Sequence, residues 1–298
     1  NPSAKYDAAG NAGIINIRFK KDQRQGLNGN LALSLGQGFY TKPSGSTNLN
    51  FRKKKWNLFG NYSYSQPKGF TRFYINRKFF NADHSLESVF DQTSFIKQPI
   101  RSHNGKFGAD FYAGKKTVIG VMFNGNLFRN TRDGFTNAII TNPEGALQYA
   151  TETDNVLKDK RFNGFGNVNF KHTIDSTGKE LTLDADYGHF NSRADQNFIT
   201  RQFSAVGNPS PDYTLHTDQR GQLSVRSLKA DYVHPLKKEA KWEAGLKSSM
   251  VETDNDIRFF NVVDGAYLPD ESNSNHFIYK ENINAAYVNF AKSFPNFD

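Results

Sequence analysis

The chain has 298 residues, of which 37% are hydrophobic and 14% aromatic, and its formal net charge is +9. Its mean hydropathy is −0.69, and no apolar run approaches the length of about 18 residues that a transmembrane helix requires, which excludes a helical span. The chain contains no cysteine, which excludes a disulfide framework, a thiolate nucleophile and a cysteine-ligated metal site.

The first alternating segments predict paired strands. Near residues 27–40 and 44–53, apolar side chains such as Leu49 and Phe51 alternate with polar ones. Alternation with a period of two is typical of a β-strand that has one apolar face and one wet face. The lysines at 53–55 form a predicted turn, and the alternation resumes after it. This part of the chain is therefore predicted to form antiparallel hairpins.

Three further short turns are predicted along the chain, each flanked by alternating segments. Asn163, Asn167 and Lys171 lie on the polar face of one such segment, whereas Phe162 and Val168 lie on its apolar face. The whole pattern gives about ten strands. The four predicted short turns lie at residues 53–55, 114–116, 175–179 and 236–239.

The opposite ends of the predicted strands are joined by much longer segments. These have roughly 10 to 35 residues, far more than ordinary hairpin loops, and we expect them to be irregular. Tight turns on one side and long loops on the other are typical of a transmembrane β-barrel. The expected long loops lie near residues 67–100, 131–160, 204–215 and 263–274.

A soluble β-sandwich is the alternative fold for such alternation. Many predicted strands exceed the usual length of about 5 to 6 residues, as a tilted membrane crossing requires. Many aromatic residues fall near the predicted strand ends, as girdles at the membrane interfaces require. We therefore predict an all-β fold, a transmembrane antiparallel up-and-down β-barrel.

The last predicted strand begins at Ala285 and runs into a short turn at residues 292–297, with no partner strand after it. An open sheet of about ten strands would leave two unpaired edges, which lipid does not tolerate. We therefore expect residues 25–298 to form the N-terminal part of a larger, incomplete barrel.

The segment before the first strand carries a family resemblance. Residues 1–17 read NPSAKYDAAGNAGIINI. In order and in position, this segment resembles the closing part of the plug domain in TonB-dependent outer-membrane receptors, of the outer-membrane β-barrel type common in Bacteroidota. Its glycines suit a tight turn because they adopt conformations that a β-carbon penalises. The positions that carry this plug-closing motif are Asn1, Pro2, Tyr6, Gly10, Gly13, Ile14, Ile15 and Asn16.

The resemblance implies that residues 1–24 end a plug domain and that the complete barrel has about 22 strands. It also implies that the short turns lie in the periplasm and the long loops outside the cell. Such receptors reside in the outer membrane and take up a scarce ligand, such as a siderophore, another metal chelate, a glycan or a peptide. Their energy comes through TonB, which would contact a segment that precedes Asn1. Outer-membrane lipid and a small ligand are thus expected partners, and a surface lipoprotein stays open as another.

Ligand choice is expected to reside in the long loops, which carry aromatic and arginine side chains. Aromatic faces stack on sugars or on aromatic iron chelators, and arginines bind carboxylates or phosphates. Packing at the membrane interface is the alternative role for each of them. The candidate ligand-binding residues are Phe70, Arg72, Tyr74, Arg129, Arg132, Phe135, Tyr149, Tyr213, Phe259 and Tyr267, with Phe73, Phe203 and Phe260 as further candidates.

No cofactor, metal site or enzymatic activity is expected. His189 shares a strand with Asp184 and Asp186, but its odd position points it to the other face. The chain has no nucleophile elbow, phosphate-binding loop or paired zinc-binding histidines. The loop acids match no calcium-binding signature; these are Asp133, Glu144, Glu152 and Asp154.

No nucleic-acid partner is expected either. Several of the lysines fall in the short turns, and the other basic residues are interspersed with acids, so the sequence indicates no single dense basic stripe with stacking aromatics, as single-strand binders have. Three functions remain: an energised uptake receptor, a passive pore or adhesin on the same barrel, and a soluble basic β-protein that binds nucleic acid or polysaccharide.

Overall fold

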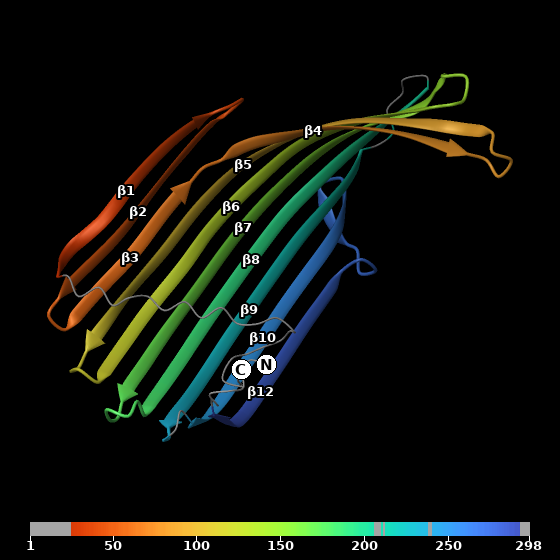
Figure 1. Ribbon diagram of the computed structural model, residues 1–298. Coiled ribbons are helices and arrows are strands. Elements are labelled where there is room, and N and C mark those ends of the chain that lie inside the picture. Colours follow the sequence, from red (N-terminus) through yellow and green to blue (C-terminus); the bar gives the residue numbers. More distant parts are fainter. Residues whose placement is uncertain (1–24, 206–209, 211, 238–239, 293–298) are drawn as a thin grey trace.

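The computed structural model describes residues 25–205, 210, 212–237 and 240–292, and these form one 12-stranded antiparallel sheet (Figure 1). Among these residues no helix is long and apolar enough to cross a bilayer. The strands are β1 (Gly26–Gln37), β2 (Thr41–Lys53), β3 (Trp56–Ser65), β4 (Lys68–Phe80), β5 (Leu86–Tyr112), β6 (Thr117–Thr141), β7 (Leu147–Thr173), β8 (Glu180–Ser204), β9 (Tyr213–Pro235), β10 (Ala240–Val263), β11 (Ala266–Pro269) and β12 (Asn275–Lys292).

The twelve strands form ten columns. β3 and β4 lie end to end against β5, separated by Gln66 and Pro67, while β11 and β12 both pair with β10. Every other column pairs with its neighbours in sequence. The predicted up-and-down topology of about ten strands is therefore confirmed, and the sheet is open, with β1 at one edge and β12 at the other.

The predicted short turns are found where the sequence places them. Lys54, Gly114 and Gly178 adopt positive φ angles of 51°, 140° and 92° at three of these turns. Glycine tolerates such angles without a steric penalty, which explains its place in two of the turns. β9 ends before the fourth turn and β10 begins after it, and residues 238 and 239 of that turn lie outside the described part of the chain.

Asp175 closes the turn between β7 and β8. Its Oδ1 accepts hydrogen bonds from the Thr177 hydroxyl (2.5 Å) and backbone N–H (2.9 Å), and Oδ2 lies 3.1 Å from the Lys179 ammonium. The hydroxyl bond is the main reason that the pKa of Asp175 is held far below its usual range. The ionised carboxylate therefore stabilises this turn.

This arrangement predicts a pH-dependent effect of Asp175→Ala. Because the folded pKa is depressed, the stabilisation is fully present above the unfolded pKa of about 3.9 and is lost as the pH falls through the folded value. Urea unfolding of the full-length protein and the variant should show a constant difference between pH 7 and pH 5 that shrinks under strong acid. A difference that grew as the pH fell would contradict this assignment.

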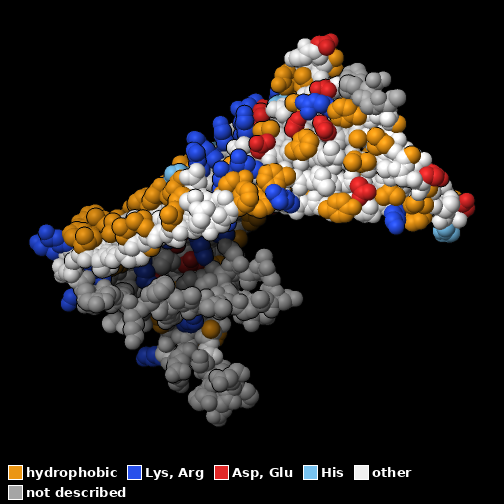
Figure 2. Space-filling model, turned by 90° about the horizontal axis from the view of Figure 1, so that it is seen from above, with side chains coloured by type: hydrophobic (Ala, Val, Ile, Leu, Met, Phe, Trp, Pro, Cys, Tyr) orange, Lys and Arg blue, Asp and Glu red, His pale blue; other side chains and the backbone are white. Residues whose placement is uncertain are grey.

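The register divides the sheet into two faces. Directly paired residues lie on the same face, so Phe107, Phe123, Tyr187 and Met250 form part of one row that crosses the strands. In the part of the sheet nearer the short turns, side chains on this face are mostly apolar and exposed over β1–β10, and Figure 2 shows them in orange along the sheet. We call this the outward face. A broad exposed apolar face is what contact with lipid requires.

The inward face is polar and internally hydrogen-bonded. Asn57 accepts a hydrogen bond from Asn50 over 3.0 Å and donates one to Asp110 over 3.1 Å, and Asn167 donates to Asp186 over 2.7 Å. On the same face, near the other edge of the sheet, the Tyr287 hydroxyl donates to the buried Asp231 over 2.5 Å. Such a face suits a water-filled lumen rather than a dry core.

The prediction of irregular loops near residues 67–100 and 131–160 is wrong. Apart from short turns at residues 81–85 and 142–146, these segments continue as strands of β4–β7. β5 and β7 reach 27 residues, far beyond the 9 to 11 or so of a membrane crossing. We call β4 and the parts of β5–β10 that continue beside and beyond it the upper sheet; Figure 1 shows its β4–β5 hairpin leaning over at the top.

Two other expected features are placed only in part. Residues 204–215 connect β8 to β9, and residues 263–274 contain the short strand β11 between two turns. The plug-closing motif and the turn expected at residues 293–297 lie outside the described residues.

Candidate functional site

An aromatic cluster forms where β4 begins. Phe39 and Tyr40, from the turn between β1 and β2, meet Phe70 of β4, with ring centroids 4.9 Å and 6.2 Å from that of Phe70. Phe70 also lies 5.6 Å from Phe95 of β5. The cluster is exposed, with Phe39 keeping 67% of its surface accessible.

Three cations cover these rings. The Lys68 ammonium lies 4.4 Å from the Tyr40 centroid, and that of Lys97 lies 5.9 Å from it. The Arg72 guanidinium lies 5.5 Å from the Phe70 centroid and 5.2 Å from that of Phe95. The resulting cation–aromatic cluster consists of Phe39, Tyr40, Lys68, Phe70, Arg72, Phe95 and Lys97.

The β4–β5 register explains how the cluster forms. Lys68, Phe70 and Arg72 alternate along β4 and so share a face, and Phe70 and Arg72 pair directly with Lys97 and Phe95. No ion pair in the described part of the chain engages the three cations. They therefore leave a site of net positive charge with exposed aromatic surfaces.

A hollow of about 400 Å³ adjoins the cluster. It is lined by Arg72, Tyr74, Phe95, Phe135 and their neighbours on β4 and β5. Tyr74 donates a hydrogen bond to Asp91, which raises the pKa of Tyr74 and lowers that of Asp91. The phenol is thus held beside the hollow by an ionised carboxylate.

The structure brings four of the ten candidate ligand residues together, namely Phe70, Arg72, Tyr74 and Phe135. The other six candidates lie apart from this group. Arg129 lies lower on the outward face, whereas Arg132, Tyr149, Tyr213 and Phe259 lie on the inward parity of their strands. Tyr267 packs against His216 instead, at 5.0 Å between centroids.

Sequence reasoning missed Phe39, Tyr40, Lys68, Phe95 and Lys97. Lys68, Phe70 and Arg72 occupy every second position, and so do Phe95 and Lys97. If residues 67–100 had been interpreted as strands, this spacing would have placed them on one face. The two residues of the β1–β2 turn carry no such signal. They reach the cluster only because β4 begins beside that turn.

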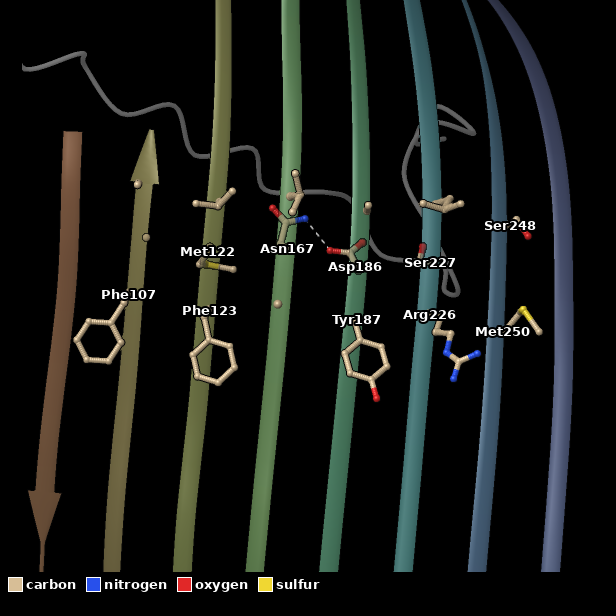
Figure 3. A pocket seen from close by; sticks show the side chains of 17 residues that line it. Phe107, Met122, Phe123, Asn167, Asp186, Tyr187, Arg226, Ser227, Ser248 and Met250 are labelled. Carbon is tan, nitrogen blue, oxygen red and sulfur yellow. Dashed lines mark hydrogen bonds between the residues drawn. The ribbon is translucent and has the colours of Figure 1, made fainter. Parts of the chain in front are cut away.

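A larger hollow lies elsewhere, on the outward face, with a volume of about 860 Å³. Figure 3 shows Phe107, Phe123, Tyr187 and Met250 side by side along it, with Arg226 between the last two. Its floor includes Gly166, whose missing side chain leaves open space above the backbone. It opens on the outward face, between exposed apolar side chains of neighbouring strands.

The acidic candidates do not converge. Asp154 pairs with Arg201 at 2.9 Å, and no group of three His, Asp or Glu side chains suited to a metal occurs in the described residues. His189 lies 3.1 Å from the Ser224 hydroxyl on the outward face. The prediction that His189 points away from Asp184 and Asp186 is confirmed by this contact.

An antiparallel up-and-down sheet with an apolar outer face, a polar inner face and strands long enough to cross a bilayer defines a transmembrane β-barrel protein. Residues 172–298 match the model of an outer membrane protein beta-barrel family. No curated protein matches the chain. The protein is therefore an outer-membrane β-barrel protein that resides in the outer membrane, and the soluble alternatives are set aside.

Proposed function

We propose that the protein is an uptake receptor whose upper sheet captures an anionic ligand with aromatic or planar groups. The cation–aromatic cluster carries this proposal. Its Arg72 guanidinium suits the oxygens of an anion in bidentate geometry, and its rings offer stacking surfaces. A ferric catecholate chelate combines both properties, since its rings are aromatic and its metal complex is anionic.

We further propose that uptake is coupled to TonB. Two observations support a plugged transporter. The sheet edges at β1 and β12 are open, and in lipid they require further strands, which a barrel of about 22 strands supplies. Residues 1–17 resemble the end of a plug domain, the element that blocks and opens so wide a lumen.

The first test uses cells that produce the full-length protein, supplied with a ⁵⁵Fe tricatecholate complex. Arg72→Gln combined with Lys97→Gln should weaken surface binding about tenfold, because each substitution removes one cation from the cluster. Arg77→Gln combined with Lys78→Gln is the matched control, since it removes the same charges farther along β4. This pair should leave binding unchanged.

An uncoupler of the inner-membrane potential separates the transport mechanisms. Energised uptake predicts that surface binding persists while accumulation of ⁵⁵Fe stops. Accumulation that continued at the same rate would indicate a passive pore. Equal binding by wild type and the Arg72/Lys97 variant would overturn the assignment of the cluster.

A further inference from the structure

The register aligns five basic residues across five neighbouring strands. Arg101 pairs with Arg129, Arg129 with Lys160, Lys160 with Arg193, and Arg193 with Arg220. All five side chains are exposed, and all lie on the outward face. We call them the basic row. Basic residues that are interspersed with acids and lie about 30 apart in the chain thus become direct neighbours in the sheet.

The basic row is electrostatically unfavourable by itself. Like charges directly opposite each other on adjacent strands destabilise a sheet. Asp218 partly compensates one end, with a carboxylate oxygen 3.3 Å from Arg193 and 2.6 Å from Arg220. At the other end, no ion pair within the described residues engages Arg101, Arg129 or Lys160. These three cations therefore favour an external anion.

The basic row begins where the apolar face ends. On β5, β6 and β7, the next outward-facing residues toward the short turns are His103, Leu127 and Phe162. The Tyr64 ring packs on His103 at 4.8 Å, as in an aromatic girdle. Figure 2 shows Lys and Arg side chains gathered beside the orange band. The three free cations thus lie at the level of the lipid headgroups on the side of the upper sheet.

Because the strands are tilted, the boundary between the apolar face and the cations lies at a different residue level on each strand. Strands of such barrels tilt by about 45°, so the bilayer plane crosses the rows obliquely. On β9 the apolar face ends lower, at Leu228, and the next outward residue is the exposed Arg226. A cation thus directly follows the last apolar side chain of the band on β6, β7 and β9, namely Arg129, Lys160 and Arg226, whereas on β8 His189 and Asn191 separate Tyr187 from Arg193.

We propose that the basic row binds the phosphate groups of the phosphorylated glycolipid, lipid A, in the outer leaflet. Neighbouring strands lie about 4.8 Å apart, so one phosphate can accept hydrogen bonds from two adjacent side chains, with arginine bidentate. The acyl chains of the same molecule then lie on the apolar face. The hollow at Phe123 is about 20 Å down β6 from Arg129, within the reach of those chains.

This inference rests on outer-membrane residence and on an orientation with the upper sheet outside the cell, which the resemblance of residues 1–17 implies, and not on ligand uptake. It commits to a lipid phosphate rather than a free phosphate because the row borders a surface that only lipid covers. The carboxylates of a soluble ligand would not be confined to this level of the barrel.

The test uses the full-length protein in detergent micelles with added lipid A, either phosphorylated or enzymatically dephosphorylated. Native mass spectrometry measures bound lipid, and thermal unfolding measures protection. Wild type should prefer the phosphorylated form at least about tenfold, and the preference should fall with salt. The triple variant Arg101→Gln, Arg129→Gln and Lys160→Gln should lose this preference.

The triple variant Lys53→Gln, Lys54→Gln and Lys55→Gln is the matched control, because it removes three charges at the opposite end of the strands and should keep the preference. Without lipid, the basic-row variant should melt at or above the wild-type temperature, since repulsion is removed. Should that variant fail to fold, Arg129→Gln alone must still reduce the preference. Equal preference in wild type and the basic-row variant, or equal protection by inorganic phosphate, would overturn the proposal.

Discussion

A lysine placed on the outward face of β6 should strongly destabilise the protein, whereas a lysine one residue farther along should not. Val121→Lys is expected to cost about 2–3 kcal/mol of unfolding free energy, because it puts a charge into the hydrocarbon region. Val121 belongs to the apolar row with Ala109 and Val168. Unfolding of the full-length protein by guanidinium in phospholipid vesicles measures the effect.

Met122→Lys is the matched control for this prediction. Met122 pairs with Asn167, whose amide donates to Asp186, so a lysine there enters a polar, acidic part of the inward face. Its effect should remain within about 0.5 kcal/mol. Equal losses for both variants, or a larger loss for Met122→Lys, would show that the two faces are assigned the wrong way round.

Gly245→Val, on the inward face, should strongly destabilise the protein. A Cβ atom at Gly245 would overlap the Tyr287 ring and lie 2.6 Å from the Asp231 carboxylate. The Tyr287 hydroxyl donates to that carboxylate, which is only 4% exposed. Overpacking combined with loss of this charge-assisted hydrogen bond should cost roughly 2–4 kcal/mol.

Gly166→Val serves as the control, because the same added atoms would enter open space at the floor of the outward hollow. We expect it to change stability little. Chemical unfolding of both full-length variants in the same vesicles gives the comparison. Since valine has the higher β-propensity, a loss at Gly166 as large as that at Gly245 would mean that the crowding at Tyr287 and Asp231 does not explain the effect at Gly245.

The sequence predicts the membrane-crossing half of this sheet well because one face there meets lipid and the other meets water. That contrast produces the alternation around Leu49 and Phe51, and the turns follow from lysine and glycine between alternating segments. The upper sheet has water on both sides. The alternation therefore fades near residues 67–100 and 131–160, although the backbone hydrogen bonds continue without interruption.

The candidate site could be predicted only in part for a related reason. Aromatic and arginine content singled out Phe70 and Arg72, but register decides which of the other residues join them. The same holds for the basic row, whose members are scattered in sequence and aligned only by strand pairing. Composition indicates which chemistry is available, while the pairing of strands determines where it gathers.

The nearest-neighbour order of the columns has a consequence for how such a chain changes over evolutionary time. Each long strand from β6 to β9 bonds only to the strands that directly precede and follow it. If a hairpin were duplicated and inserted between β7 and β8, its two outer strands would pair with β7 and β8. No pairing elsewhere in the sheet would change. Circumference can thus grow or shrink by two strands at a time, and lumen width becomes a quantity that selection adjusts in steps of one hairpin.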